Sequence, residues 1–122
     1  MKNIFLVVFA IFSFTLTAFS VTPSASAMDK DVVILDVRTP EEFNQNHIDG
    51  SVNINFLGSD FKEQVSKLDK NKNYKLYCRS GNRSGKAMTL MNSMGFNHIE
   101  NIGSLQQASK TLEKSCSPQP SC

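Results

Sequence analysis

The sequence contains no tryptophan, only two histidines and three cysteines, and almost no excess of either charge. Its 13 basic and 11 acidic residues leave a formal net charge of +2. This balance gives no indication of binding to nucleic acid or to an acidic partner surface. Histidine and cysteine are too sparse and too scattered for a zinc site, so we expect no metal.

The first part of the chain has almost no charge, because Lys2 is the only charged residue before Asp29. Residues 4–19 are almost wholly apolar, but this run is shorter than the roughly 20 residues that span a bilayer. Ala25-Ser26-Ala27 then fits a signal peptidase site. We expect residues 1–27 to be a cleaved signal peptide, with an uncleaved anchor as the alternative. The mature chain would then be periplasmic or otherwise exported, and not held in the membrane.

The remaining residues suit one small domain, which we place at 28–115, followed by a C-terminal tail at 116–122. Cys116 and Cys122 bracket Ser-Pro-Gln-Pro-Ser in that tail. They can form a local disulfide in an oxidising compartment, or remain two free thiols in a disordered end. If they pair, Cys78 is the single leftover thiol, which marks it as a candidate reactive group.

Strand-like and helix-like segments alternate along residues 32–114, which predicts an α/β fold with a small parallel sheet. We expect four to five strands with helices on both faces. The expected strands are 32–35, 51–55, 74–77 and 97–102, and the expected helices begin near Pro40 and cover about 59–68, 84–94 and 104–114. Residues 47–50 read as a turn. In such a sheet, ligands bind beyond the carboxyl ends of the strands.

The most informative segment, residues 77–84, is Tyr-Cys-Arg-Ser-Gly-Asn-Arg-Ser. It places Cys78 between a strand and a helix N-terminus, where backbone N–H groups and the helix dipole stabilise an anion. Such an environment favours the thiolate, which is the nucleophile. Gly81 allows the tight turn that an anion cradle needs, and Arg79 and Arg83 add positive charge. The alternative is an inert, buried core cysteine.

Two segments resemble the signatures of rhodanese-type sulfurtransferases. One is the loop at 77–84, and the other is residues 35–43 followed by 47–54 (Leu-Asp-Val-Arg-Thr-Pro-Glu-Glu-Phe, then His-Ile-Asp-Gly-Ser-Val-Asn-Ile). The resemblance covers nearly all of residues 31–105 and is greatest to small, exported, single-domain rhodaneses of the phage-shock-protein-E type. It implies a rhodanese-like fold and a thiosulfate sulfurtransferase activity.

The resemblance also implies a role for each matching residue. Cys78 would take a sulfane sulfur from thiosulfate or a related donor as a persulfide, then pass it to cyanide or a thiol. The partners would therefore be a small anionic sulfur donor and a thiophilic acceptor, with no cofactor, because the cysteine carries the sulfur. The substrate-binding loop would consist of Arg79, Ser80, Gly81, Asn82, Arg83 and Ser84. A carrier or redox partner that loads sulfur without turnover is the alternative.

Asp36 and Arg38 lie at the same expected sheet edge as this loop, so they can orient it or line its mouth. The resemblance favours a structural, loop-supporting role for both. A catalytic pair of Cys78 with His47 is a weaker alternative, because His47 falls in a turn or packing position.

A cysteine phosphatase is the rival enzyme class, with five residues between its cysteine and its arginine. Here Arg83 follows Cys78 after only four residues, and the shorter loop fits sulfur better than a phosphate group. The chain departs from the family pattern at Gly103-Ser104, where the family often has Gly-Gly and an aromatic residue. The sequence leaves the oligomeric state open.

Overall fold

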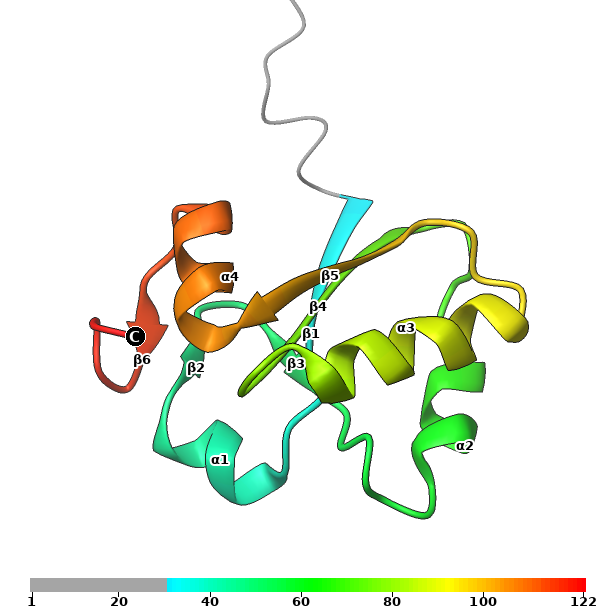
Figure 1. Cartoon of the computed structure of the whole chain (residues 1–122), viewed down its shortest axis with the longest axis horizontal. Helices are drawn as coiled ribbons and strands as arrows, with labels where there is room; N and C mark the ends of the chain where they lie inside the picture. Colours follow the sequence, from blue (N-terminus) through cyan, green and yellow to red (C-terminus); the bar gives the residue numbers. More distant parts are fainter. Residues whose placement is uncertain (1–30) are drawn as a thin grey trace, which may run out of the picture.

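The computed structural model describes residues 31–122, so the expected signal peptide lies outside the described residues. Its centre is a four-stranded parallel sheet in the order β3-β1-β4-β5 (Figure 1). The strands are β1 (Val32–Asp36), β3 (Val52–Asn53), β4 (Asn73–Cys78) and β5 (Ile99–Ser104). The helices are α1 (Pro40–Gln45), α2 (Phe61–Ser66), α3 (Asn82–Ser93) and α4 (Leu105–Leu112). The predicted α/β fold is confirmed.

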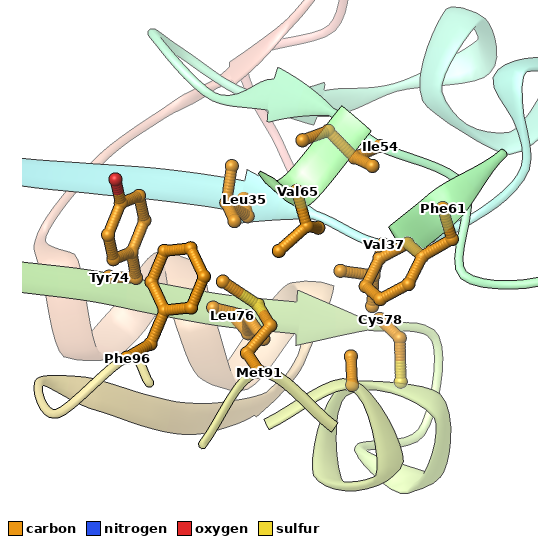
Figure 2. Close-up of a cluster of buried hydrophobic side chains, with 11 residues drawn as sticks. Leu35, Val37, Ile54, Phe61, Val65, Tyr74, Leu76, Cys78, Met91 and Phe96 are labelled. Carbon is orange, nitrogen blue, oxygen red and sulfur yellow. The ribbon is translucent and has the colours of Figure 1, made fainter. Parts of the chain in front are cut away.

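Helices cover both faces of the sheet, so the central strands β1 and β4 are buried on both sides. One core contains Leu35, Leu76 and Cys78 from the sheet, packed against α2 and α3 (Figure 2). The second core contains Ile34 and Tyr77 from the same two strands, packed against α4. Successive residues of a strand face opposite sides, which is why the apolar run at 32–35 is continuous rather than alternating.

The local sequence explains where the helices begin and end. Thr39 caps α1 in a capping box with Glu42, and Pro40 occupies the first helical position. Ser104 caps α4 in the same way with Gln107. Helix α3 begins at Asn82, two residues before the expected start, and ends before Gly95, which adopts a positive φ of 98°.

Two segments differ from expectation. His47–Ile48, expected as a turn, forms a short strand β2, and Cys116–Ser117 forms β6, which pairs with it antiparallel. The residues that we separated as a tail therefore pack on the domain, and Cys116 is buried in the second core. The sequence did not reveal this pairing because each strand has only two residues, too few for a periodic pattern to show.

Within residues 31–122, no helix has the length and apolar character needed to span a membrane. The same part of the chain contains no group of three or more histidine, cysteine or acidic side chains arranged to hold a metal ion.

Candidate active site

Cys78 is the last residue of β4, and its sulfur points toward the first turn of α3 (Figure 2). The loop turns back on the sulfur, so that the Gly81 N–H lies 2.9 Å from Cys78 Sγ and donates to it. The Ser84 hydroxyl lies 3.4 Å from the same sulfur. Gly81 adopts a φ of 91°, a left-handed conformation that glycine accepts without strain. The loop therefore surrounds the sulfur with hydrogen-bond donors, as the sequence predicted.

This environment favours the thiolate form of Cys78. Burial of the side chain raises its pKa, because a charged sulfur loses water. Hydrogen bonds from Ser84, Ser80 and Gly81 outweigh that effect, and the net pKa of Cys78 is lowered. The thiolate fraction, and with it the nucleophilicity at neutral pH, is therefore larger than for an ordinary cysteine.

The two arginines of the loop have different surroundings. Arg79 is exposed, and among residues 31–122 it forms no ion pair. We expected Arg83 also to face an anion, but it instead makes a two-pronged ion pair with Glu42, at 2.8 and 3.0 Å. The Arg83 guanidinium holds the pKa of Glu42 down at about 2. Arg79 is thus the loop arginine whose charge is available to a ligand.

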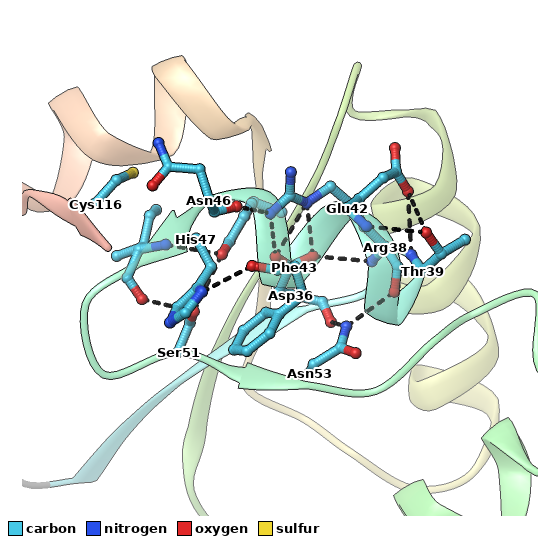
Figure 3. A network of polar contacts seen from close by, with 12 residues as sticks. Asp36, Arg38, Thr39, Glu42, Phe43, Asn46, His47, Ser51, Asn53 and Cys116 are labelled. Carbon is cyan, nitrogen blue, oxygen red and sulfur yellow. Dashed lines mark hydrogen bonds and ion pairs between the residues drawn. The ribbon is translucent and has the colours of Figure 1, made fainter. Parts of the chain in front are cut away.

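Asp36 and Arg38 form a buried ion pair at the end of β1 (Figure 3). Arg38 Nη2 lies 2.5 Å from Asp36 Oδ2, and the backbone N–H of Arg38 donates to Asp36 Oδ1 at 2.9 Å. The same guanidinium donates to the carbonyl of Asn46, at 2.6 Å, which ties the end of α1 to the sheet. The arginine also lies 5.5 Å from the centre of the Tyr77 ring. These contacts brace the end of β1 against α1 and Tyr77 rather than against residues 79–84, so the loop-supporting role of Asp36 and Arg38 stays a prediction.

His47 does not share the hydrogen bonds of the sulfur. Its Nδ1 lies 2.8 Å from the Phe43 carbonyl, and its ring stacks on Phe43 with the centroids 3.7 Å apart. The donors to Cys78 are Gly81 and Ser84 instead. His47 thus occupies a packing position rather than that of a partner to Cys78.

A polar cavity of ≈ 270 Å³ lies beside the loop. Its lining comes from the Cys78 loop, from α1 and the residues just before it, and from the start of α4. The lining residues are Arg38, Glu42, Gln45, Arg79, Leu105 and Gln106. Arg79 is the cation of this lining that forms no ion pair among residues 31–122, since Arg38 is paired with Asp36, and the Glu42 carboxylate is paired with Arg83. A small anion at this cavity would therefore meet the charge of Arg79 and the amide donors of Gln45 and Gln106. Of the predicted loop residues, Ser80 and Asn82 are exposed at the surface, whereas Ser84 is fully buried.

Sequence reasoning missed two residues of this site, Glu42 and Asn101. Glu42 looked like a helix-start residue, and its second role as the partner of Arg83 joins segments 41 residues apart. Asn101, on β5, hydrogen-bonds to both Gly81 and Ser84. A lone asparagine in a strand has no sequence signal for such a contact, although its unfavourable β-propensity could have prompted the question.

Cys116 and Cys122 are joined by a disulfide, the first of the two alternatives that the sequence left open. Cys78 is the one free cysteine among the described residues. The disulfide loop is held against the domain, because Asn46 Nδ2 donates to the Ser121 carbonyl at 2.9 Å and the Asp49 N–H donates to the Ser115 carbonyl at 3.0 Å.

Comparison with known proteins agrees with this geometry. The family model for the rhodanese-like domain matches residues 24–110 of this chain. The chain is similar to the thiosulfate sulfurtransferase PspE of Escherichia coli, with 39% identity over 74 residues, covering 59% of this chain and 69% of that protein. It is also similar to the chloroplastic thiosulfate sulfurtransferase 16 of Arabidopsis thaliana, with 40% identity over 78 residues, covering 56% and 65%.

A solved structure described as a rhodanese with anions from E. coli has the same fold, with a TM-score of 0.55 and 36% identity. The match covers 62% of this chain and 89% of that one. The matched segment thus spans about two thirds of the two curated relatives named above and most of the solved structure. Fold, loop and family description agree, and the chain belongs to the rhodanese family.

Proposed function

We propose that the protein is a thiosulfate sulfurtransferase in which Cys78 carries the sulfur as a persulfide. The observation that carries the proposal is the Gly81 N–H, 2.9 Å from Cys78 Sγ, in a loop that lowers the pKa of the thiol. Membership of the rhodanese family and similarity to two thiosulfate sulfurtransferases support the choice of donor.

In the first half-reaction, the Cys78 thiolate attacks the outer sulfur of thiosulfate. The S–S bond of thiosulfate breaks, sulfite leaves with the electron pair, and a persulfide remains on Cys78. Backbone donors that already point at Sγ can hold the negative charge of the persulfide. Arg79 and the polar cavity beside it are suited to attract the dianionic donor and the departing sulfite.

In the second half-reaction, a thiophilic acceptor such as cyanide or a thiolate attacks the outer sulfur of the persulfide. The new bond to the acceptor forms as the persulfide S–S bond breaks, and the Cys78 thiolate is regenerated. Because the sulfur waits on the protein between the two steps, ping-pong kinetics are expected.

We also propose that the protein works outside the cytoplasm. The leader-like sequence at residues 1–27 supports this, as does the disulfide between Cys116 and Cys122, since such bonds persist in oxidising compartments.

The test is intact-mass measurement after incubation with thiosulfate, followed by an assay of thiocyanate formation with cyanide. The wild-type protein should gain one sulfur atom and turn over, and Cys78→Ser should do neither. A Cys116→Ser/Cys122→Ser variant is the matched control and should still gain the sulfur. Failure of the wild type to gain sulfur would refute the mechanism, whereas loading without turnover would show a sulfur carrier instead of an enzyme.

A further inference from the structure

The Asn101 side chain occupies the centre of the contacts between β5 and the Cys78 loop. Its Nδ2 donates to the Gly81 carbonyl at 3.0 Å. Its Oδ1 accepts from the Ser84 hydroxyl at 2.7 Å and from the Gly103 N–H at 3.0 Å. One amide thus joins the turn of the loop, the first turn of α3 and the end of β5.

These partners leave only one orientation for the amide. The Gly81 carbonyl can only accept, and the Gly103 N–H can only donate, so the nitrogen must face Gly81 and the oxygen must face Gly103. The oxygen therefore receives the Ser84 proton whenever Ser84 donates to Asn101. Ser84 is fully buried, so its hydroxyl depends on these protein partners rather than on water.

The loop, α3 and β5 approach one another closely around Asn101. A Cβ on Gly81 would lie in van der Waals contact with the Gly103 Cα, at 3.4 Å, and a Cβ on Gly85 would make a slightly tighter contact with Asn101 Nδ2, at 3.3 Å. Gly103, whose N–H donates to Asn101, has a φ of 88°, a left-handed conformation that glycine adopts without strain. The chain therefore brings the loop, α3 and β5 together around this one amide.

We propose that Asn101 is a positioning residue, which holds the Cys78 loop in the conformation that stabilises a negative charge on sulfur. It acts through two residues that touch the sulfur. The hydrogen bond from Asn101 to the Gly81 carbonyl fixes the peptide plane that follows Gly81. The N–H of the same residue, in the preceding peptide plane, donates to Cys78 Sγ at 2.9 Å. The contact with Ser84 fixes its hydroxyl 3.4 Å from the sulfur, although Asn101 Oδ1, at 2.7 Å, is the nearer acceptor for its one proton.

The two contacts have opposite effects on the thiolate, so their balance can be tested. Without Asn101 the loop loses its anchor, which weakens the Gly81 donor and raises the pKa of Cys78. However, Ser84 then has no competing acceptor and can donate to the sulfur alone, which lowers the pKa. We expect the loss of the anchor to dominate, because Asn101 holds three groups together and without it the turn at Gly81, the first turn of α3 and the end of β5 all lose a fixed partner.

The experiment is a pH titration of Cys78 followed by the ultraviolet absorbance of its thiolate, with Cys78→Ser as the blank, because this readout does not require a reagent to reach the buried sulfur. Only Cys78 contributes, because Cys116 and Cys122 are in a disulfide. Asn101→Ala should raise the apparent pKa of Cys78 by about one unit, the size expected for one weakened hydrogen bond to a charged group, and reduce the thiolate fraction about tenfold below that pKa. If Asn101→Ala does not fold, Asn101→Ser is measured with the same expectation, since one hydroxyl cannot hold three partners.

Asn53→Ala is the matched control. Asn53 is also a half-buried strand asparagine, on β3 at the opposite side of the sheet, and its amide donates to the carbonyls of Asp36 and Arg38, at 3.0 and 2.9 Å. Its loss should lower the melting temperature but leave the Cys78 pKa unchanged. An unchanged or lowered Cys78 pKa in the Asn101 variant, or an equal rise in the Asn53 variant, would overturn the proposal.

The role proposed for Asn101 rests on the proposed function in one respect, namely that the Cys78 loop serves sulfur transfer. The absorbance titration measures the thiolate directly and needs no sulfur donor. If the wild type takes up no sulfur from thiosulfate, the proposed function fails, but the titration curves still decide the role of Asn101. With active protein, Asn101→Ala should also lower kcat/KM for thiosulfate by about the same factor as the thiolate fraction.

Discussion

At the scale of single residues, the site is decided by how each charge is paired. Two of its cations are held by carboxylates, Arg38 by Asp36 and Arg83 by Glu42, while Arg79 remains exposed beside the cavity. Ion pairing leaves the cradle with fewer available positive charges than the sequence suggests. The hydrogen bonds of the loop backbone therefore contribute more to thiolate stability than the loop arginines do.

Glu42 should make the stability of the protein depend on acid pH. Its carboxylate accepts from Arg83 and from the Thr39 N–H, and these contacts lower its pKa from 4.5 to about 2. A carboxyl whose pKa is lower in the folded state stabilises that state above its unfolded pKa. This contribution should be complete above about 4.5 and lost as the pH falls toward about 2.

The measurement is the melting temperature against pH for wild type and Glu42→Gln. Above pH 4.5 the variant should be less stable by about 1 kcal/mol, since the pair is partly exposed to solvent and screened. The two curves should converge as the pH approaches 2. Glu63→Gln is the control, because Glu63 pairs with Lys67 fully at the surface. A constant difference between wild type and Glu42→Gln at all pH values would contradict the assignment.

At the scale of secondary structure, the central strand β4 is linked to β2 by one tyrosine. The Tyr77 hydroxyl accepts from the Ile48 N–H at 3.1 Å and lies 3.1 Å from Ser51 Oγ. Burial of this side chain raises the pKa of Tyr77 well above its usual range, so the hydroxyl remains neutral. The hydrogen bond to the Tyr77 hydroxyl gives a partner to the Ile48 N–H, a backbone donor of β2 that is buried away from water.

Tyr77→Phe should therefore destabilise the protein by about 1–3 kcal/mol, because the Ile48 N–H is left without a partner. Tyr74→Phe is the matched control. The Tyr74 hydroxyl donates to the carbonyl of Asp69, an exposed residue whose carbonyl can bind water instead. Its loss should cost less, about 1 kcal/mol or under. Urea unfolding of both variants gives the comparison, and equal losses would show that the Tyr77 hydroxyl has no special role.

The elements also show how far local sequence goes in predicting structure. Strand β1 and helix α1 were predictable, because a β-branched apolar run and a Thr-Pro-Glu-Glu start act within a few residues. Strands β2 and β6 were not predictable, because their pairing joins residues about 70 positions apart through two residues each. The Cys78 loop was predictable in composition, whereas its anchor Asn101 was not, since that contact depends on how β5 lies against α3.

At the scale of the whole molecule, the C-terminal disulfide closes the chain onto the domain. Cys116 is buried beside Ile48 in the second core, and Cys122 packs against the same core. The disulfide lies in the β2–β6 region and the free thiol of Cys78 at the end of β4, so we expect stability and the proposed sulfur chemistry to depend on different cysteines.

Cys116→Ala/Cys122→Ala should lower the free energy of unfolding by about 2 kcal/mol, the scale expected for closing a short loop, with some further loss from the core. Sulfur loading on Cys78 should persist at temperatures below the new transition. Thermal unfolding and intact mass measure the two effects separately. A loss of sulfur loading in the folded double variant would show that the disulfide supports the active site as well.

The sequence by itself determined the family, the alternation of strands and helices, and the position of the candidate reactive cysteine, because each of these is encoded in residues close together along the chain. Tertiary structure alone decided that Arg83 is paired with Glu42, that Asn101 anchors the loop, and that the last seven residues belong to the folded domain. The physical reason is that these contacts join distant segments, and their geometry exists only once the sheet and its helices have packed together.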